Sequence, residues 1–193
     1  NGRRRQRQMC IRDRKRTRDK IAGYLKELGI DVHCGVGIVG ILRSGEGRKV
    51  IGLRADMDAL PIHETNTHDY VSKNVGVMHA CGHDGHMTML LGAAHKLSTN
   101  KNFSGTIVFI FQPNEELGLG AKAMMEEGLL ENFPIHEIYG IHNLPGVPTG
   151  ELLTRSGVIC SSESLFEIKI KGMGGHSSMP VSYTHLRAHE TIA

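Results

Sequence analysis

Apolar runs of strand length alternate with helical stretches along most of this sequence, and that order constrains the fold more than any other feature. The strand-like runs are 37–42, 49–55, 106–112, 137–142, 150–154 and 165–172, and the helical stretches are 17–29, 86–97 and 120–130. The runs 49–55 and 106–112 show little polar alternation, which is typical of strands buried on both faces. The sequence therefore predicts the α/β class, with a mostly parallel sheet flanked by helices.

The residue composition and the hydrophobic pattern of the sequence change after Thr154. A segment of small residues is followed by the alternating apolar residues Phe166, Ile168 and Ile170. Such alternation is typical of a strand that has one face in water. We therefore expect a domain boundary near residue 160 and the start of a second, α+β domain beyond it.

The composition is that of a soluble globular protein, since 39% of the 193 residues are hydrophobic and 22% are charged. No stretch approaches the roughly 18 apolar residues of a membrane span, and no secretory signal pattern is present. The four cysteines form no CxxC pair, so a disulfide scaffold is not expected. We expect a cytoplasmic location and no membrane partner.

Basic residues are concentrated at the N-terminus. Residues 1–20 hold ten of the 23 lysines and arginines with only two aspartates, whereas residues 21–193 hold 13 basic and 18 acidic residues. An arginine-rich arm on an acidic body is one pattern of nucleic-acid binding. The arm carries no interleaved aromatic residues and no helical repeat, so no nucleic-acid partner is expected. A non-catalytic metal- or nucleic-acid-binding module with an Arg-rich arm remains the alternative function.

Polar residues of one chemical kind follow three of the predicted strands. They are Asp56 and Asp58 after the second run, Asn114, Glu115 and Glu116 after the third, and His142 and Asn143 after the fourth. A fourth segment, 79–86, reads HACGHDGH and precedes the helical stretch 86–97. Because ligands of open α/β sheets bind beyond the carboxyl ends of the strands, we expect these four segments to converge at one edge.

A thiolate, imidazoles and carboxylates in one place are the donors that a Zn²⁺-like or Mn²⁺-like ion requires. Cys81 and His83 are spaced so that both can reach one ion from a turn, and a helix N-terminus or a nearby cation lowers a thiol pKa. Of the adjacent Glu115 and Glu116, one can bind metal while the other acts as a general base. The alternatives are a solvated histidine loop with a small buried cysteine, and two glutamates that complement a helix dipole.

Five motifs, in order, resemble those of the M20 peptidase family in its amidohydrolase branch. They are RADMDALPIHE (54–64), MHACGHDGHMTMLLGAA (78–94), GTIVFIFQPNEELGLGAKAMMEEG (105–128), GIHNLPG (140–146) and GMGGHSSMP (172–180). That branch holds hippurate hydrolases, auxin-conjugate hydrolases and N-acetyl-diaminopimelate deacetylases. The resemblance runs from about Thr17 to Pro180 and implies a zinc-peptidase-like catalytic domain followed by a lid domain.

The resemblance also implies roles for single residues. The implied metal ligands are Cys81, His83, Glu116 and His142. Glu115 is the implied general base, Asp58 is expected to orient groups of the metal site, and His176 resembles a lid-domain histidine that reaches substrate. His86 has no ligand role in this comparison, and we expect it to pack against the site or to support it.

By the same resemblance, the function is metal-dependent hydrolysis of the amide bond of N-acyl amino acids to a carboxylate and a free amino acid. A metal-bound water deprotonated by Glu115 would attack the amide carbonyl, and Glu115 would return the proton to the leaving amine. The implied cofactor is Zn or Mn, with two ions per full-length subunit. The full-length protein is expected to be a homodimer.

Both ends of the sequence depart from the family pattern. Residues 1–16 and 181–193 match no family motif, and we expect them to be a disordered or artefactual leader and a foreign tail. Between them we expect a partial catalytic domain at 17–159 and the start of the lid or dimerisation domain at 160–180. A further metal-binding histidine of the family has no counterpart, so we expect this fragment to be inactive.

Overall fold

A computed structural model describes residues 16–162, 166 and 168. The chain divides into two compact units, Asn1–Gly146 and Val147–Ala193. Among the described residues, the first unit has as its first element a helix at 16–27. Its remaining elements are β1 (Asp31–Cys34), β2 (Ile38–Ser44), β3 (Val50–Asp56), α2 (His83–Thr99), β4 (Gly105–Gln112), α3 (Gly120–Glu126), α4 (Leu129–Asn132) and β5 (Glu137–Gly140).

The five strands form one sheet in the order β1-β2-β4-β3-β5. Strand β3 pairs in parallel with both β4 and β5, whereas β2 is antiparallel to both β1 and β4. The predicted α/β class is confirmed, and the sheet is mixed. The antiparallel part begins with a hairpin, since only three residues join β1 to β2, which is too short for the crossover that parallel neighbours need.

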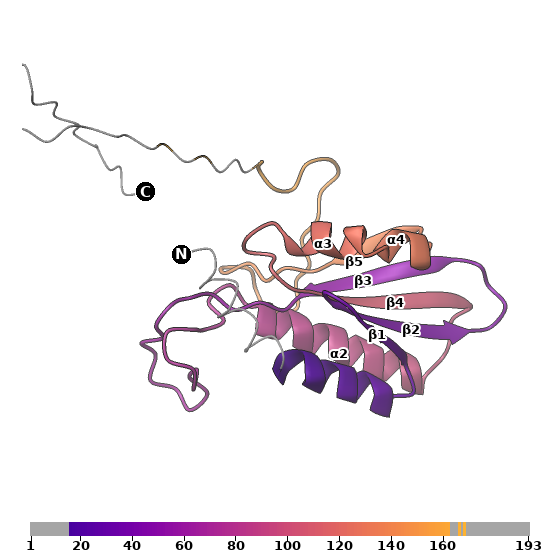
Figure 1. The fold of residues 1–193 in the computed structure, drawn as a ribbon, viewed down its shortest axis with the longest axis horizontal. Helices are drawn as coiled ribbons and strands as arrows, with labels where there is room; N and C mark the ends of the chain where they lie inside the picture. The colour runs from indigo at the N-terminus through magenta and orange to yellow at the C-terminus, as the bar shows by residue number, and fades with distance from the viewer. Residues whose placement is uncertain (1–15, 163–165, 167, 169–193) are drawn as a thin grey trace, which may run out of the picture. The chain divides into compact units, whose positions relative to one another are not determined.

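Helices cover both faces of the sheet, as Figure 1 shows: α2 and the helix 16–27 lie along one face, and α3 and α4 lie on the other. The alternation of β4 explains this arrangement. Phe109 and Phe111 belong to the cluster that includes Leu25 and Leu90 from the two helices of the first face. Val108 and Ile110 instead pack with Met124 of α3. Strand β4 is therefore buried on both faces, as its continuous apolar run predicts.

Two elements differ from the prediction. The helical stretch 120–130 is interrupted, because Gly128 has φ 88 and separates α3 from α4. The strand predicted at 150–154 is wrong: these residues have no regular structure, and the adjacent Leu152 and Leu153 are 81% and 68% exposed. Two neighbouring apolar side chains point to opposite faces of a strand, so this run gives no single face to bury. Most of the strand predicted at 165–172 lies outside the described residues.

Strand β5 is an edge strand whose four residues are all exposed. Its apolar side chains include Ile138 and Tyr139, and Ile141 and Leu144 beyond it are also exposed. The two compact units divide after Gly146, and the domain boundary near residue 160 stays a prediction. In the part of the chain that the structure describes, every helix is too short or too polar to cross a bilayer.

Candidate metal centre

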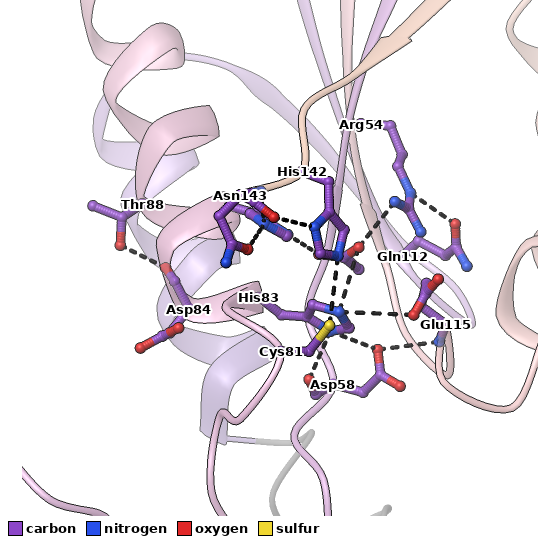
Figure 2. Close-up of polar contacts among 12 residues, drawn as sticks. Arg54, Asp58, Cys81, His83, Asp84, Thr88, Gln112, Glu115, His142 and Asn143 are labelled. Carbon is purple, nitrogen blue, oxygen red and sulfur yellow. Dashed lines mark hydrogen bonds and ion pairs between the residues drawn. The ribbon is translucent and has the colours of Figure 1, made fainter. Parts of the chain in front are cut away.

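The four polar segments of the sequence meet at one edge of the sheet, as Figure 2 shows. The register explains why, because Asp56 at the end of β3 pairs with Gln112 at the end of β4, and Arg54 pairs with Gly140 at the end of β5. The carboxyl ends of β3 and β4 are therefore level, and β5 ends opposite Arg54, so that the residues after Gly140 continue toward the same edge. The N-terminus of α2 adds the segment that contains Cys81 and His83.

His83 lies at the centre of the cluster and is fully buried. Its Nδ1–H donates to the backbone oxygen of Asp58 at 2.8 Å. The proton on Nδ1 leaves a lone pair on Nε2, and this buried nitrogen has no hydrogen-bond partner. Carboxylate oxygens of Glu115 and Glu116 each lie 3.7 Å from it. A buried lone pair surrounded by carboxylates is costly unless a cation shares the site.

Cys81 and His142 complete the group of predicted ligands. The Cys81 Sγ lies 3.5 Å from the His142 Nε2, while the Nδ1–H of His142 donates to the backbone oxygen of Asn143 at 2.7 Å. Ligand atoms of Cys81, His83 and His142 all lie within 4.8 Å of one another, as do those of His83, Glu115 and Glu116. The four predicted ligands and the predicted base are therefore brought together around His83.

The donor set fits a divalent ion on two grounds. It combines one thiol, two imidazoles and carboxylates, which suits zinc and related ions. In addition, both histidines donate Nδ1–H to a backbone carbonyl, Asp58 for His83 and Asn143 for His142, so that the lone pair of each ring lies on Nε2. A metal-binding histidine is usually held in this way.

The thiol of Cys81 does not have the lowered pKa that its place before a helix predicts. Burial, followed by the negative charge of Glu116 and a hydrogen bond to it, raises the pKa of the Cys81 thiol to about 11, with smaller contributions from Glu115 and Asp56. Without a bound cation, burial and the three carboxylates therefore raise this pKa, and the lowering expected from a helix N-terminus together with a cation stays a prediction for the metal-bound site. Metal binding at Cys81 has to release a proton.

Asp58 holds the segment that carries the two glutamates. Its carboxylate accepts the backbone N–H groups of Glu115 at 3.1 Å and of Glu116 at 3.2 Å. The preceding Asn114 has φ 53, a left-handed conformation that asparagine tolerates better than most residues. This turn bends the chain out of β4, and the Asp58 carboxylate fixes the bend. Asp58 also lies 3.4 Å from the His83 Nδ1.

A second, buried network lies behind the ligands, and the sequence pattern did not single it out. Asp56 is fully buried and accepts Nη1–H of Arg54 at 2.9 Å and Nδ1–H of His86 at 2.7 Å. Nε–H of Arg54 donates to the Oε1 of Gln112 at 2.9 Å. Burial alone raises the pKa of Asp56, but the hydrogen bond from His86 and the charge of Arg54 outweigh it, so the pKa is lowered.

His86 is buried and contacts the site, as expected. Besides Asp56, its ring reaches Asn143, whose backbone N–H donates to Nε2 at 3.0 Å. Between Cys81 and His83, Gly82 has φ 99, and a Cβ there would overlap the side-chain amide of Asn143. One feature of the sequence could have indicated this network: Arg54 and Asp56 are two residues apart in an apolar strand, so their opposite charges lie on the same face. The predicted substrate residue His176 lies outside the described residues.

Together, these features define an α/β protein with a cluster of side chains that could hold a metal ion at the carboxyl ends of its parallel strands. Residues 52–192 match the model of peptidase family M20/M25/M40, and the chain belongs to that family. The predicted resemblance is therefore confirmed. The match also includes most of the segment 181–193, which contains none of the five family motifs.

Several hydrolases are similar to this chain in sequence. The hippurate hydrolase of Campylobacter jejuni is 45% identical over 167 residues, which cover 85% of this chain and 43% of that protein. An IAA-amino acid hydrolase of Arabidopsis thaliana is 48% identical over 168 residues, which cover 85% of this chain and 38% of that protein. The chain thus spans less than half the length of these relatives.

Solved structures show the same fold. The crystal structure of the Bacillus subtilis YXEP protein, described as a dinuclear metal binding peptidase from the M20 family, superimposes with a TM-score of 0.65 at 39% sequence identity. The superposition covers 70% of this chain and 38% of that one. A structure described as an aminohydrolase from methicillin-resistant Staphylococcus aureus gives a TM-score of 0.66 at 39% identity, over 70% of this chain and 37% of that one.

Proposed function

We propose that this chain forms part of a metal-dependent amidohydrolase that cleaves the amide bond of N-acyl amino acids to a carboxylate and a free amino acid. Family membership supports hydrolysis in general. The names of the hippurate and IAA-amino acid hydrolases support this substrate class, since hippurate is itself an N-acyl amino acid. The proposal rests most on one observation: the buried Nε2 of His83, unpartnered and facing Glu115 and Glu116.

In the proposed centre, Cys81, His83, Glu116 and His142 hold the metal. A bound Zn²⁺ or Mn²⁺ would supply Lewis-acid activation of water and of the amide carbonyl. Two ions per full-length subunit are proposed, in keeping with the dinuclear relative. Asp58 contributes by fixing the backbone of Glu115 and Glu116, so that one carboxylate serves as ligand while its neighbour stays available for proton transfer.

Glu115 is proposed as the general base. Its side chain is 37% exposed, so substrate and water can reach it, while its Oε2 lies 3.7 Å from the His83 Nε2. Glu115 would take a proton from water as the water oxygen bonds to the amide carbon. It would then give that proton to the amine nitrogen as the carbon–nitrogen bond breaks. The immediate products are the carboxylic acid and the free amine; the acid then gives up its proton, which the amine takes up as it becomes an ammonium ion, and Glu115 is left as it began.

A test of this proposal is the substitution Glu115→Gln, which keeps the shape of the side chain but removes its basicity. Because the chain spans less than half of its relatives, the 167 aligned residues are grafted into the Campylobacter hippurate hydrolase and hippurate cleavage is measured. We expect kcat to fall by about 10²- to 10⁴-fold with unchanged metal content. The matched control Glu116→Gln should lower the metal content instead. A Glu115→Gln chimera within tenfold of its parent would rule out the assigned base.

The remaining parts of the proposal come from the family resemblance. We propose that His176 contacts substrate, that the full-length enzyme is a cytoplasmic homodimer, and that the boundaries near residues 16, 160 and 180 separate the leader, the lid and the tail from the catalytic domain. The 193-residue chain alone should cleave little or no hippurate, since a further ligand is expected from outside it. Turnover by the purified chain would contradict this expectation.

A further inference from the structure

A continuous path of hydrogen bonds links β3, α2 and the segment after β5. It starts at Arg54, passes through the buried carboxylate of Asp56 to Nδ1 of His86, and continues from Nε2 of His86 to the backbone N–H of Asn143. The backbone carbonyl of Asn143 then accepts Nδ1–H of His142. Figure 2 shows that this path ends beside Cys81.

The fixed donors of the path determine where the protons lie. A backbone N–H can only donate, so the Nε2 of His86 is an acceptor and the proton of the neutral ring lies on Nδ1. That proton is donated to the Asp56 carboxylate, which cannot donate when ionised. In the structure the Oδ1 of the Asn143 side-chain amide lies 2.6 Å from Nε2, so this tautomer requires the amide to be turned until its amino group faces the ring.

The same reasoning fixes the ring of His142. Its Nδ1–H donates to the carbonyl of Asn143, so the Nε2 lone pair faces the Cys81 Sγ at 3.5 Å. The ring also lies against His86, with centroids 4.5 Å apart and an interplanar angle of 62°. Both polar groups of the Asn143 backbone are therefore used: one is anchored by His86, and the other orients His142.

Asp56, His83 and His86 have ligand atoms close enough for a metal of their own. The hydrogen bonds argue against that use. Oδ1 of Asp56 and Nδ1 of His86 are bonded to each other at 2.7 Å, and the other nitrogen of His86 accepts from Asn143. A metal at this place would have to displace both bonds.

We propose that Asp56 and His86 are positioning residues, which fix the ring of His142 through the backbone of Asn143 so that its Nε2 points at Cys81. The inference rests on the proposed function, in which His142 and Cys81 are ligands. Asp56 sets the tautomer of His86, and His86 anchors Asn143. Neither residue contacts the metal or the substrate in this role.

Two substitutions of His86 separate its two contacts. His86→Gln places an amide oxygen near the position of Nε2 and can still accept the N–H of Asn143, whereas His86→Asn reaches only Asp56. The control is His95→Asn, the same change at an exposed position of the same helix. Circular dichroism establishes that each variant of the 193-residue chain is folded before it is compared.

The first measurement is the imidazole ¹⁵N spectrum of the chelator-treated chain, recorded about two pH units above the ordinary histidine pKa of about 6.5. We expect His142 to be a fixed Nδ1–H tautomer in the parent, in His95→Asn and in His86→Gln. In His86→Asn it should become an averaged mixture of tautomers. An unchanged His142 tautomer in His86→Asn, or an averaged one in the parent, would overturn the inference.

The second measurement is Co²⁺ affinity, followed by the sulfur-to-cobalt charge-transfer absorption of Cys81. We expect His86→Asn to weaken binding by about 10- to 100-fold, the usual effect of removing support from a ligand. His86→Gln should weaken it much less, and His95→Asn should leave it unchanged. Equal affinity in His86→Asn and the parent would overturn the inference. Absence of sulfur-ligated Co²⁺ in the parent would refute the proposed metal site, while the ¹⁵N spectra would still decide the role of His86.

Discussion

The buried carboxylate of Asp56 offers the sharpest test of how the site is held together. Asp56→Asn keeps the shape of the side chain but leaves one oxygen for two donors, the Nη1–H of Arg54 and the Nδ1–H of His86. The amide nitrogen must then face one of these donors. A buried donor without an acceptor costs about 1–3 kcal/mol, and a lost bond to a charged group about 1.5–3 kcal/mol.

The size of the effect follows from the burial of the partners. The side chain of Arg54 is 25% exposed, so water can replace part of its lost bond, whereas His86 is 1% exposed and has no such relief. We therefore expect a loss of about 3 kcal/mol in the free energy of unfolding at pH 7. For a chain of this size, that corresponds to a fall in Tm of about 6–12 °C.

The pH dependence has a defined sign. Because the pKa of Asp56 is lowered in the folded chain, its carboxylate stabilises the fold above its ordinary pKa of about 4, and this contribution is lost as pH falls through the folded value. Urea unfolding of parent and variant from pH 7 to pH 3 should show a gap that narrows below about pH 4. The exposed control Asp31→Asn should change stability by less than about 0.5 kcal/mol. Equal midpoints for Asp56→Asn and the parent, or a gap independent of pH, would refute the reasoning.

Two further predictions use Cys81 and a pair of glycines. The pKa of the Cys81 thiol is raised to about 11, and the thiol must lose its proton to bind Zn²⁺, so Zn²⁺ affinity should rise about tenfold per pH unit between about pH 7 and 9. Competition with a chromophoric chelator measures this affinity. An affinity that does not change with pH would contradict the prediction. A Cβ at Gly120 would overlap the carbonyl oxygen of Pro113, whereas one at Gly92 in α2 meets nothing. Gly120→Ala should therefore destabilise the chain by about 1–3 kcal/mol, and Gly92→Ala should stabilise it by about 0.5–1 kcal/mol. Urea unfolding measures both changes, and equal urea midpoints for the two variants would contradict the prediction.

The parts of the fold that could be predicted are those set by local pattern. The run 106–112 has no polar alternation, and it is the strand buried on both faces, β4. Strand β1 was missed, because Asp31–Cys34 has no apolar run and its residues are mostly exposed. Its place in the sheet comes from pairing with β2 rather than from its own composition. A three-residue connection then makes this hairpin antiparallel, a feature that no run of apolar residues reveals.

The candidate site likewise has a part that the sequence pattern predicts and a part that it does not. Cys81, His83 and Glu116 stand next to strand ends and a helix start, so their convergence follows from the topology of parallel strands. The bonds of Asp56 to Arg54 and His86 depend on which side chains meet in three dimensions. The pKa of Cys81 could not be predicted either, because its direction depends on the burial of the thiol and on the carboxylates that surround it.

The glycine between Cys81 and His83 restricts how this site can be varied. Its left-handed backbone disfavours any other residue, and the space where a side chain would begin belongs to Asn143. A library that randomises positions 81–83 should thus return glycine in the middle even when selected only for the geometry of its neighbours. Gly82 has no side chain that could bind a metal, yet it is the position of the three that tolerates the fewest substitutions when the thiol of Cys81 or the imidazole of His83 is exchanged.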